Sequence, residues 1–213
     1  MNTVSAPERD PVILHNLRWE TFLALLEDLG EHRGRITYDR GTVEIVPPTQ
    51  KHESLKRLIG RLIETYTLEM VIPIASCSST TLKSRLENRG IEPDECYYVG
   101  NEAAVRGKDS IELETDPPPD LAVEIEVSTR WVDRRSVYAA LRIPEVWSHD
   151  GEKLTVFLLA GDGEYRPSSK SRAFPALPLE ELAGFIDRRS TGDETSLLRA
   201  FRDWVRGRFA TGS

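Results

Sequence analysis

Residues 119–127 read Pro-Asp-Leu-Ala-Val-Glu-Ile-Glu-Val, and this stretch sets the expectations for fold and chemistry. Its odd-numbered positions from Leu121 to Val127 are apolar, and a period of two is that of a β-strand. The even positions place Glu124 and Glu126 on one face. The simplest interpretation is the solvated outer face of an antiparallel sheet. On a buried face the two carboxylates would instead need partners or a metal ion.

Three further features favour the metal-binding interpretation. A Pro-Asp pair precedes the strand residues twice, at Pro93-Asp94 and Pro119-Asp120. A predicted helix that carries Asp133-Arg134-Arg135 follows directly, and an earlier helix starts with His52 and Glu53. Oxygen ligands from separate strands, with a cation nearby, are the groups that Mg²⁺ and a phosphodiester require.

The pattern of apolar residues outside this stretch predicts a mixed protein. Apolar residues recur at helical spacing in residues 17–29, 51–70, 131–141, 180–186 and 194–209. Asn16 is the expected cap of the first helix. Strands are predicted at residues 35–38, 42–46, 72–85, 96–99, 121–127, 145–147 and 153–159, with a hairpin partner around Tyr165. Residues 102–119 are polar and predict a loop. The predicted helices and strands together indicate the fold class α/β (α+β).

Composition limits the classes of function. The 213 residues carry a formal net charge of −7, and the pI is about 5.3. A dedicated non-specific DNA-binding protein is normally basic, because neutralising phosphates supplies most of its affinity. The charge therefore argues against such a protein. It does not exclude an enzyme, because the negative charge of an acidic metal site is offset by the bound cation.

Targeting signals and cysteine usage indicate a cytoplasmic protein. No apolar run approaches the ~18–20 residues of a membrane helix. Residues 1–11 hold Glu8, Arg9 and Asp10 and lack the apolar stretch of a secretory signal. The two cysteines, Cys77 and Cys96, have neither a CxxC spacing nor that of a metal site. We therefore expect two reduced thiols and no association with a membrane.

Three blocks follow one another along the chain: Glu92-Pro93-Asp94-Glu95-Cys96-Tyr97-Tyr98-Val99, then residues 119–127, then Tyr138-Ala139-Ala140-Leu141-Arg142-Ile143-Pro144-Glu145-Val146-Trp147. Together they resemble the Uma-two family of restriction-endonuclease-like proteins in the PD-(D/E)XK nuclease superfamily. The resemblance covers roughly residues 16–186. It implies a restriction-endonuclease-like core, a mixed central sheet flanked by helices, over residues 16–187. Residues 1–15 would be an N-terminal extension and residues 188–213 a C-terminal amphipathic helix.

The resemblance also implies a metal site. In the superfamily an Asp on one strand and a Glu on the next bind Mg²⁺, which Mn²⁺ can replace, and the matching residues are Asp94 and Glu124. Glu126 stands where the superfamily has its Lys and is a further candidate ligand. In this family the Lys commonly lies four residues before Tyr138, at the position of Arg134. Because an Arg stays charged, it can stabilise a phosphate but cannot help to deprotonate water.

Two more residues are candidate accessories to this site. Asp120 lies four residues before Glu124 on the same strand, about 13 Å away at ~3.3 Å per residue, which is too far to share one cation. We expect it to support the entry to the strand. His52 stands where the family often has a His. The alternative for His52 is a helix-start histidine that hydrogen-bonds to nearby backbone.

Two main functions remain open from the sequence. The first is a metal-dependent endonuclease that hydrolyses phosphodiester bonds in DNA, with catalytic residues Asp94, Glu124 and Arg134. The second is a catalytically silenced nuclease fold that acts as a binding or scaffolding module. The acidic pI and Arg134 favour this second function. A third hypothesis, with less support from the sequence, is a factor that acts on RNA. The apolar stripe through Phe201, Trp204 and Val205 would pack on the domain or form a homodimer interface.

Overall fold

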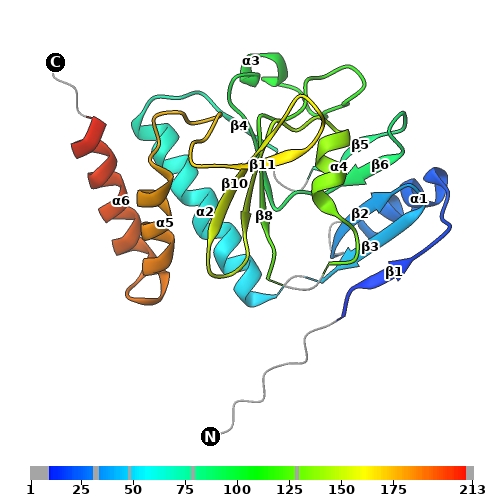
Figure 1. The fold of residues 1–213 in the computed structure, drawn as a ribbon, viewed down its shortest axis with the longest axis horizontal. Helices are drawn as coiled ribbons and strands as arrows, with labels where there is room; N and C mark the ends of the chain where they lie inside the picture. The colour runs from blue at the N-terminus through cyan, green and yellow to red at the C-terminus, as the bar shows by residue number, and fades with distance from the viewer. Residues whose placement is uncertain (1–9, 31–33, 48, 78–79, 128–129, 210–213) are drawn as a thin grey trace, which may run out of the picture.

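The computed structural model describes residues 10–30, 34–47, 49–77, 80–127 and 130–209. The chain forms two β-sheets with helices packed against them, so the predicted mixed class is confirmed. A six-stranded sheet occupies the middle of the molecule, and a five-stranded sheet lies to one side of it (Figure 1). The candidate site lies where these two sheets meet.

The larger sheet has the strand order β11-β10-β9-β8-β7-β4. Its central neighbours β8 and β9 pair in parallel and its other pairs are antiparallel, so the sheet is mixed, as predicted. A parallel pair needs a crossover connection, and helix α4 (Arg134–Ala140) lies in it. The strands are β4 (Ala75–Ser76), β7 (Glu95–Tyr98), β8 (Leu121–Ile125), β9 (Glu145–His149), β10 (Leu154–Leu159) and β11 (Tyr165–Ser168).

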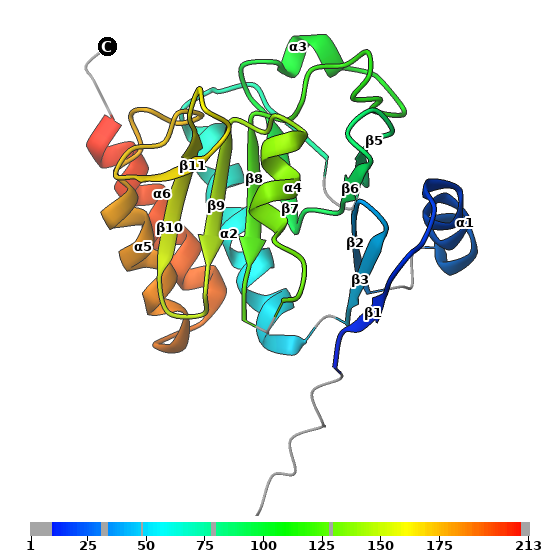
Figure 2. The same cartoon turned by 45° about the vertical axis from the view of Figure 1, so that its right-hand side comes forward.

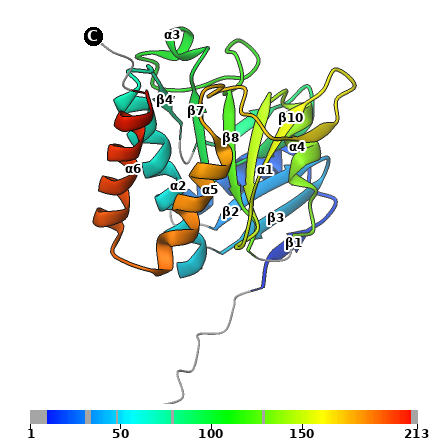
Figure 3. The same cartoon turned by 60° about the vertical axis from the view of Figure 1, so that its left-hand side comes forward.

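Three helices cover one face of this sheet: α2 (Gln50–Glu69), α5 (Leu179–Asp187) and α6 (Glu194–Phe209), with a 3₁₀ turn at Arg188–Ser190 between the last two. Figure 3 shows them grouped on the same side of the strands. The apolar stripe of α2 packs there with Leu121, Val123 and Ile125 of β8. Phe201 and Val205 of α6 are buried in the same core, so most of the C-terminal stripe packs on the domain.

Helix α4 covers the opposite face of the larger sheet (Figure 2). Val137 and Tyr138 of α4 pack on Ala122 and Val146, in a core that extends to Ile91 of the smaller sheet. Strand β8 is therefore buried on both faces. Its apolar odd positions face α2, and its even positions, Glu124 among them, face α4. The solvated-face interpretation of this strand is wrong.

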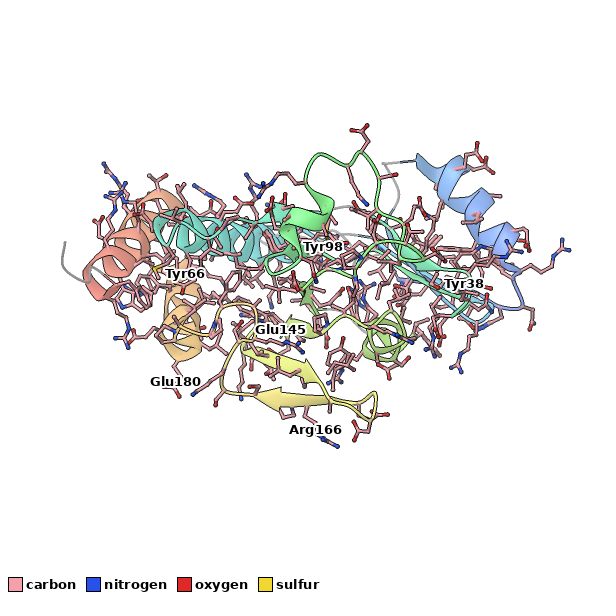
Figure 4. All side chains as sticks on the ribbon, turned by 90° about the horizontal axis from the view of Figure 1, so that it is seen from above. Tyr38, Tyr66, Tyr98, Glu145, Arg166 and Glu180 are labelled. Atoms are coloured by element: carbon pink, nitrogen blue, oxygen red, sulfur yellow. A yellow bond between two sulfur atoms is a disulfide. The ribbon has the colours of Figure 1, made fainter. Side chains whose placement is uncertain are left out.

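The smaller sheet is antiparallel in the order β1-β3-β2-β6-β5, and α1 (Trp19–Leu29) packs against it. Its strands are β1 (Val12–Leu14), β2 (Arg35–Asp39), β3 (Thr42–Val46), β5 (Leu82–Ser84) and β6 (Arg89–Ile91). Helix and sheet approach closely at Gly90, where an added Cβ would lie 2.6 Å from the Phe22 ring. Figure 4 shows Tyr38 of this sheet and Tyr66 of α2 toward opposite ends of the molecule.

Most predicted elements form within a few residues of their expected bounds, and the differences have local causes. The first helix has Arg18 rather than Asn16 at its N-cap, because Asn16 adopts a left-handed turn with φ of 58°. The region 72–85 forms two strands in different sheets, with residues 78–79 outside the described residues. The polar region 102–119 contains the short helix α3 (Glu102–Val105). Strands β1 and β6 were not predicted, and β1 lies within the expected N-terminal extension.

The expectation of two reduced thiols is wrong for this structure, which joins Cys77 and Cys96 in a disulfide. Their sequence separation of 19 residues gave no sign of the pairing. The fold creates it by bringing the end of β4 beside β7, where the Cys77 amide donates to the Cys96 carbonyl at 2.9 Å. Both residues are buried. No helix in the described ranges combines the length and apolar character needed to cross a membrane.

Candidate active site

Sheet pairing brings Asp94 and Glu124 together. Strands β7 and β8 pair antiparallel with Glu95 opposite Val123. Continued by one residue, this register puts Asp94 directly opposite Glu124, where the Cβ atoms of cross-strand neighbours lie about 4.5–5.5 Å apart. The Ile125 amide also donates to Asp94 Oδ2 at 2.7 Å. Two of the predicted catalytic residues therefore form an acidic pair, Asp94 and Glu124, on adjacent strands.

Asp94 is fully buried and ionised. Its Oδ2 lies 2.9 Å from His52 Nε2, and its Oδ1 forms an ion pair with Arg35 Nε. Burial alone would raise the pKa of this carboxyl. The hydrogen bond from His52 and the charge of Arg35 outweigh it and lower the pKa of Asp94 to about 2. Asp94 is thus a carboxylate at any physiological pH.

The start of helix α2 positions His52. Thr49 is the N-cap of this helix, and its side chain accepts a hydrogen bond from the His52 amide at 3.2 Å. The imidazole points into the protein, is 4% exposed, and lies between Asp94 and Glu53, whose Oε1 is 3.1 Å from Nδ1. His52 therefore contacts an acid of the pair through its side chain. The alternative, a histidine that only supports the start of the helix, accounts for its backbone amide but not for its imidazole.

Glu124 is also buried but in a different electrostatic situation. Its Oε1 accepts a hydrogen bond from Arg134 Nη2 at 2.5 Å and another from the Tyr138 hydroxyl. Its Oε2 is buried and has no hydrogen-bond partner in the described part of the chain. Burial is the largest influence and raises the pKa of Glu124, although the charge of Arg134 opposes it. Asp94 Oδ1 also accepts no hydrogen bond among the described residues but is ion-paired with Arg35, so Oε2 is the oxygen of the pair left for an additional positive ligand.

Helix α4 delivers Arg134 to the acidic pair. Asp133 caps the helix and accepts from the Arg135 and Ser136 amides, which fixes the first turn. The Arg134 guanidinium is held by Thr37 Oγ1 at 2.6 Å and by the Glu92 carbonyl at 2.8 Å, in addition to Glu124. Burial disfavours its charge, but the adjacent Glu124 carboxylate raises the pKa of Arg134 above its usual value. Arg134 is a fixed cation whose Nε has no partner among the described residues.

The structure adds residues that the sequence analysis missed. Arg35 of β2 forms ion pairs with both Asp94 and Glu53, the latter at 3.0 Å, and Tyr138 donates to Glu124. Arg35 and Thr37 share one face of β2 and both reach the site. The sequence did contain one indication of their role, because Arg35 and Thr37 are a charged and a polar residue on the same face of a predicted hairpin strand. Tyr138 is buried in the core, and its hydroxyl has this additional role.

Glu126 and Asp120 lie apart from the acidic pair. Glu126 follows the end of β8 and lines a cavity of about 260 Å³ with Arg130, Trp131 and Arg134. Asp120 instead organises the chain after β7. Its Oδ2 accepts from the Val99 and Asn101 amides at 2.7 and 2.9 Å. This is the support at strand entry that was expected for Asp120.

A larger cavity lies elsewhere in the molecule. It has a volume of about 890 Å³ and is lined by residues of α1, β4, β5, α3 and the segment after α3. None of the predicted site residues lines it. Its size alone is not a reason to move the chemistry there, because the buried, charge-perturbed acids are a stronger indication of a reactive site.

The donor atoms of the acidic pair fit a Mg²⁺ ion. Magnesium in proteins is usually held by one or two carboxylates, with waters and substrate phosphates completing the octahedron. Two adjacent buried carboxylates, each with one oxygen that accepts no hydrogen bond among the described residues, meet that requirement. In the regions that the structure describes, no three His, Cys, Asp or Glu side chains form a group able to hold a metal. A third protein ligand, predicted to be Glu126, is therefore not part of a preformed set.

Comparison with known proteins identifies the family of the chain. The family Uma2, described as "Putative restriction endonuclease", matches residues 19–187. The chain belongs to this family. A crystal structure described as "a putative nuclease belonging to DUF820", from Anabaena variabilis ATCC 29413, is similar at a TM-score of 0.47 and 15% identity, over 76% of this chain and 90% of that one. No curated protein matches the chain. The Uma2 match spans both acids, His52 and Arg134.

Proposed function

We propose that this Uma2 protein is a Mg²⁺-dependent endonuclease that hydrolyses phosphodiester bonds in DNA. The observation that carries the proposal is the buried acidic pair Asp94 and Glu124, with a Glu124 Oε2 that has no hydrogen-bond partner in the described ranges and a fixed guanidinium beside it. Membership of a family described as restriction endonucleases supports a nucleic-acid substrate.

The chain's own groups have distinct tasks in this proposal. Asp94 and Glu124 would hold the ion, and Glu126 would join them when substrate binds. The bound metal would supply Lewis-acid polarisation of the phosphoryl oxygen and a water of lowered pKa. Arg134, which remains charged throughout, would stabilise the developing negative charge on the phosphate through Nε, which makes no hydrogen bond to the residues described. His52 and Arg35 hold Asp94 ionised and in place.

A second candidate function follows from the same contacts. Arg35 already neutralises Asp94 and Arg134 already neutralises Glu124. An acid site whose charge is fully compensated by arginines fits a nuclease fold that has lost catalysis and acts as a binding or scaffolding module. An Arg at the position where the family commonly has Lys points the same way.

Cleavage of supercoiled plasmid and of oligonucleotides in Mg²⁺ or Mn²⁺ tests the first function. We expect nicking by the wild type, and loss of nicking in Glu124→Gln and in Asp94→Asn. Asp162→Asn, which changes a half-exposed acid in the turn between β10 and β11, is the matched control and should cut like the wild type. Cleavage that persists in both acid variants would overturn the assignment.

Arg134→Lys separates the two functions. A higher rate in this variant than in the wild type would place the role of the family's Lys at residue 134. Cleavage by the variant alone would identify a silenced enzyme. No cleavage by either, with nucleic-acid binding retained, would support the binding module. Activity on RNA in place of DNA would contradict the proposed substrate and keep the mechanism.

A further inference from the structure

The loop between β8 and α4 presents an exposed tryptophan beside the candidate site. Trp131 is 73% exposed, although large apolar side chains normally avoid water. Its backbone is nevertheless fixed, because its amide donates to Oε1 of Glu44 at 2.7 Å and Glu44 itself is fully buried. The residue is therefore anchored through its backbone, with the indole at the surface. It lines the 260 Å³ cavity that also contains Glu126 and Arg134.

The preceding residue, Arg130, lies close enough to Glu124 for its charge to oppose the rise in the pKa of that carboxyl. Its Nε, Nη1 and Nη2 are all buried, and none of them has a hydrogen-bond partner within the residues described. Arg130 lines the cavity of Trp131 and also a small cavity of about 10 Å³ bordered by Arg35 and His52. A buried guanidinium that makes no hydrogen bonds is costly. A guanidinium fork of this kind fits the oxygens of a phosphate.

Arg130 and Trp131 together fit the binding of a single nucleotide better than the binding of the DNA backbone along a broad surface. We propose that Arg130 and Trp131 form a nucleotide-binding element in which the guanidinium holds a backbone phosphate and the indole stacks on an unpaired base. The proposal rests on the nuclease function proposed for the same site and adds its substrate class, a single-stranded or locally opened strand.

Physical arguments favour an unpaired base. In a duplex both faces of each base are covered by its stacked neighbours, so an aromatic side chain reaches a face only in single strands or after a base is flipped out. The chain carries a net charge of −7 and so lacks the broad positive field typical of duplex binders. One phosphate contact combined with one stacking contact supplies local affinity that the overall charge does not.

Binding without catalysis tests this element. We would measure the Kd of a short fluorescein-labelled oligothymidylate in EDTA, where no metal-dependent cleavage occurs. The comparison strand has the same length and phosphates but abasic sugars throughout. The variants are Trp131→Ala, Trp131→Phe and Arg130→Gln. The control is Leu86→Ala, which removes another exposed apolar side chain, in the turn between β5 and β6.

The two side chains have different expected signatures. Trp131→Ala should raise the Kd for oligothymidylate about tenfold, the effect of one lost base stack, and leave binding of the abasic strand unchanged. Trp131→Phe should retain most of the affinity, because a ring remains. Arg130→Gln should weaken both strands and reduce the salt slope by about one. Leu86→Ala should bind both strands like the wild type.

Several results would overturn the element. One is equal binding of oligothymidylate by the wild type and Trp131→Ala. Another is an equal loss on both strands, which would indicate a structural role. Absence of oligonucleotide binding, with self-association that depends on Trp131, would assign the indole to a protein contact. Failure of the nuclease proposal looks different: plasmid remains intact while base-dependent binding through Trp131 persists.

Discussion

Removing the guanidinium of Arg134 should strongly destabilise the fold. Arg134 is 5% exposed and Glu124 is 1% exposed. In Arg134→Gln, Glu124 would keep only the Tyr138 hydroxyl at Oε1, while Oε2 is already without a partner in the described residues. Breaking a buried ion pair on one side costs about 3–5 kcal/mol, because the other charge stays buried and uncompensated.

The expected shift in melting temperature follows from the size of the chain. For domains of about 150–250 residues, 1 kcal/mol corresponds to roughly 2–4 °C, so Arg134→Gln should melt about 10 °C below the wild type at pH 7.5. The double variant Arg134→Gln/Glu124→Gln should recover much of the loss, because no buried charge is then left unpaired. Differential scanning calorimetry or thermal unfolding followed by circular dichroism measures both.

The loss should also depend on pH. Burial already raises the pKa of Glu124, and removal of Arg134 should raise it further. A carboxyl whose folded pKa lies above its unfolded value makes the folded state bind protons more tightly, so stability falls as pH rises through that interval. The deficit of Arg134→Gln should therefore be largest near neutral pH and smaller near pH 5, where the variant's Glu124 can be protonated.

An exposed ion pair provides the control. Arg206 of α6 pairs with Glu69 of α2 and is 58% exposed, so Arg206→Gln should melt close to the wild type, since exposed pairs contribute little. A melting temperature of Arg134→Gln that matched this control would refute the view that Arg134 compensates a buried carboxylate. So would a double variant no more stable than the single one.

Three further predictions concern the acids and the cysteines. Asp94 has a pKa of about 2 when folded, so it should add about 2 kcal/mol of stability that is complete above pH 4 and lost as pH falls toward 2. The wild type should lose this increment between pH 4 and 2 and Asp94→Asn should not, as acid titration of the melting temperature will show. Millimolar Mn²⁺ should raise the melting temperature of the wild type but not of Glu124→Gln, and equal shifts would contradict a metal site at Glu124. Protein purified without reductant and then denatured should show no free thiol, and reducing Cys77–Cys96 should cost about 3 kcal/mol for a loop of roughly 20 residues; two titratable thiols would contradict the disulfide.

Sequence alone predicted the parts of the fold whose signals are local. The stripe of α2 and the hairpin of β2 and β3 are periodic over their whole length. The smaller sheet as a unit was not predicted, because β6 (Arg89–Ile91) has three residues and a central glycine, and it pairs with β2 some 50 residues earlier. No pattern within such a segment indicates its partner.

The same distinction applies to the site. Asp94 and Glu124 were identified because motifs mark them, and strand register then places them opposite each other. Arg35 and Tyr138 were missed as site residues because their roles depend on which carboxylate they meet. A sequence shows that a strand or helix carries these side chains, but the contact exists only after β2 and α4 have packed against β7 and β8.

The contacts around the acidic pair also bear on the choice between an active and a silenced site. A purely structural network has a physical reason to satisfy every buried polar atom, because each one left over costs about 1–3 kcal/mol. Each acid of the pair has one oxygen that accepts no hydrogen bond among the described residues. For Asp94 that oxygen is Oδ1, which is ion-paired with Arg35. For Glu124 it is Oε2, because Tyr138 and Arg134 both donate to Oε1. Arg134 therefore compensates Glu124 through Oε1 alone. The other carboxylate oxygen is left as an acceptor, as a site that still binds metal requires.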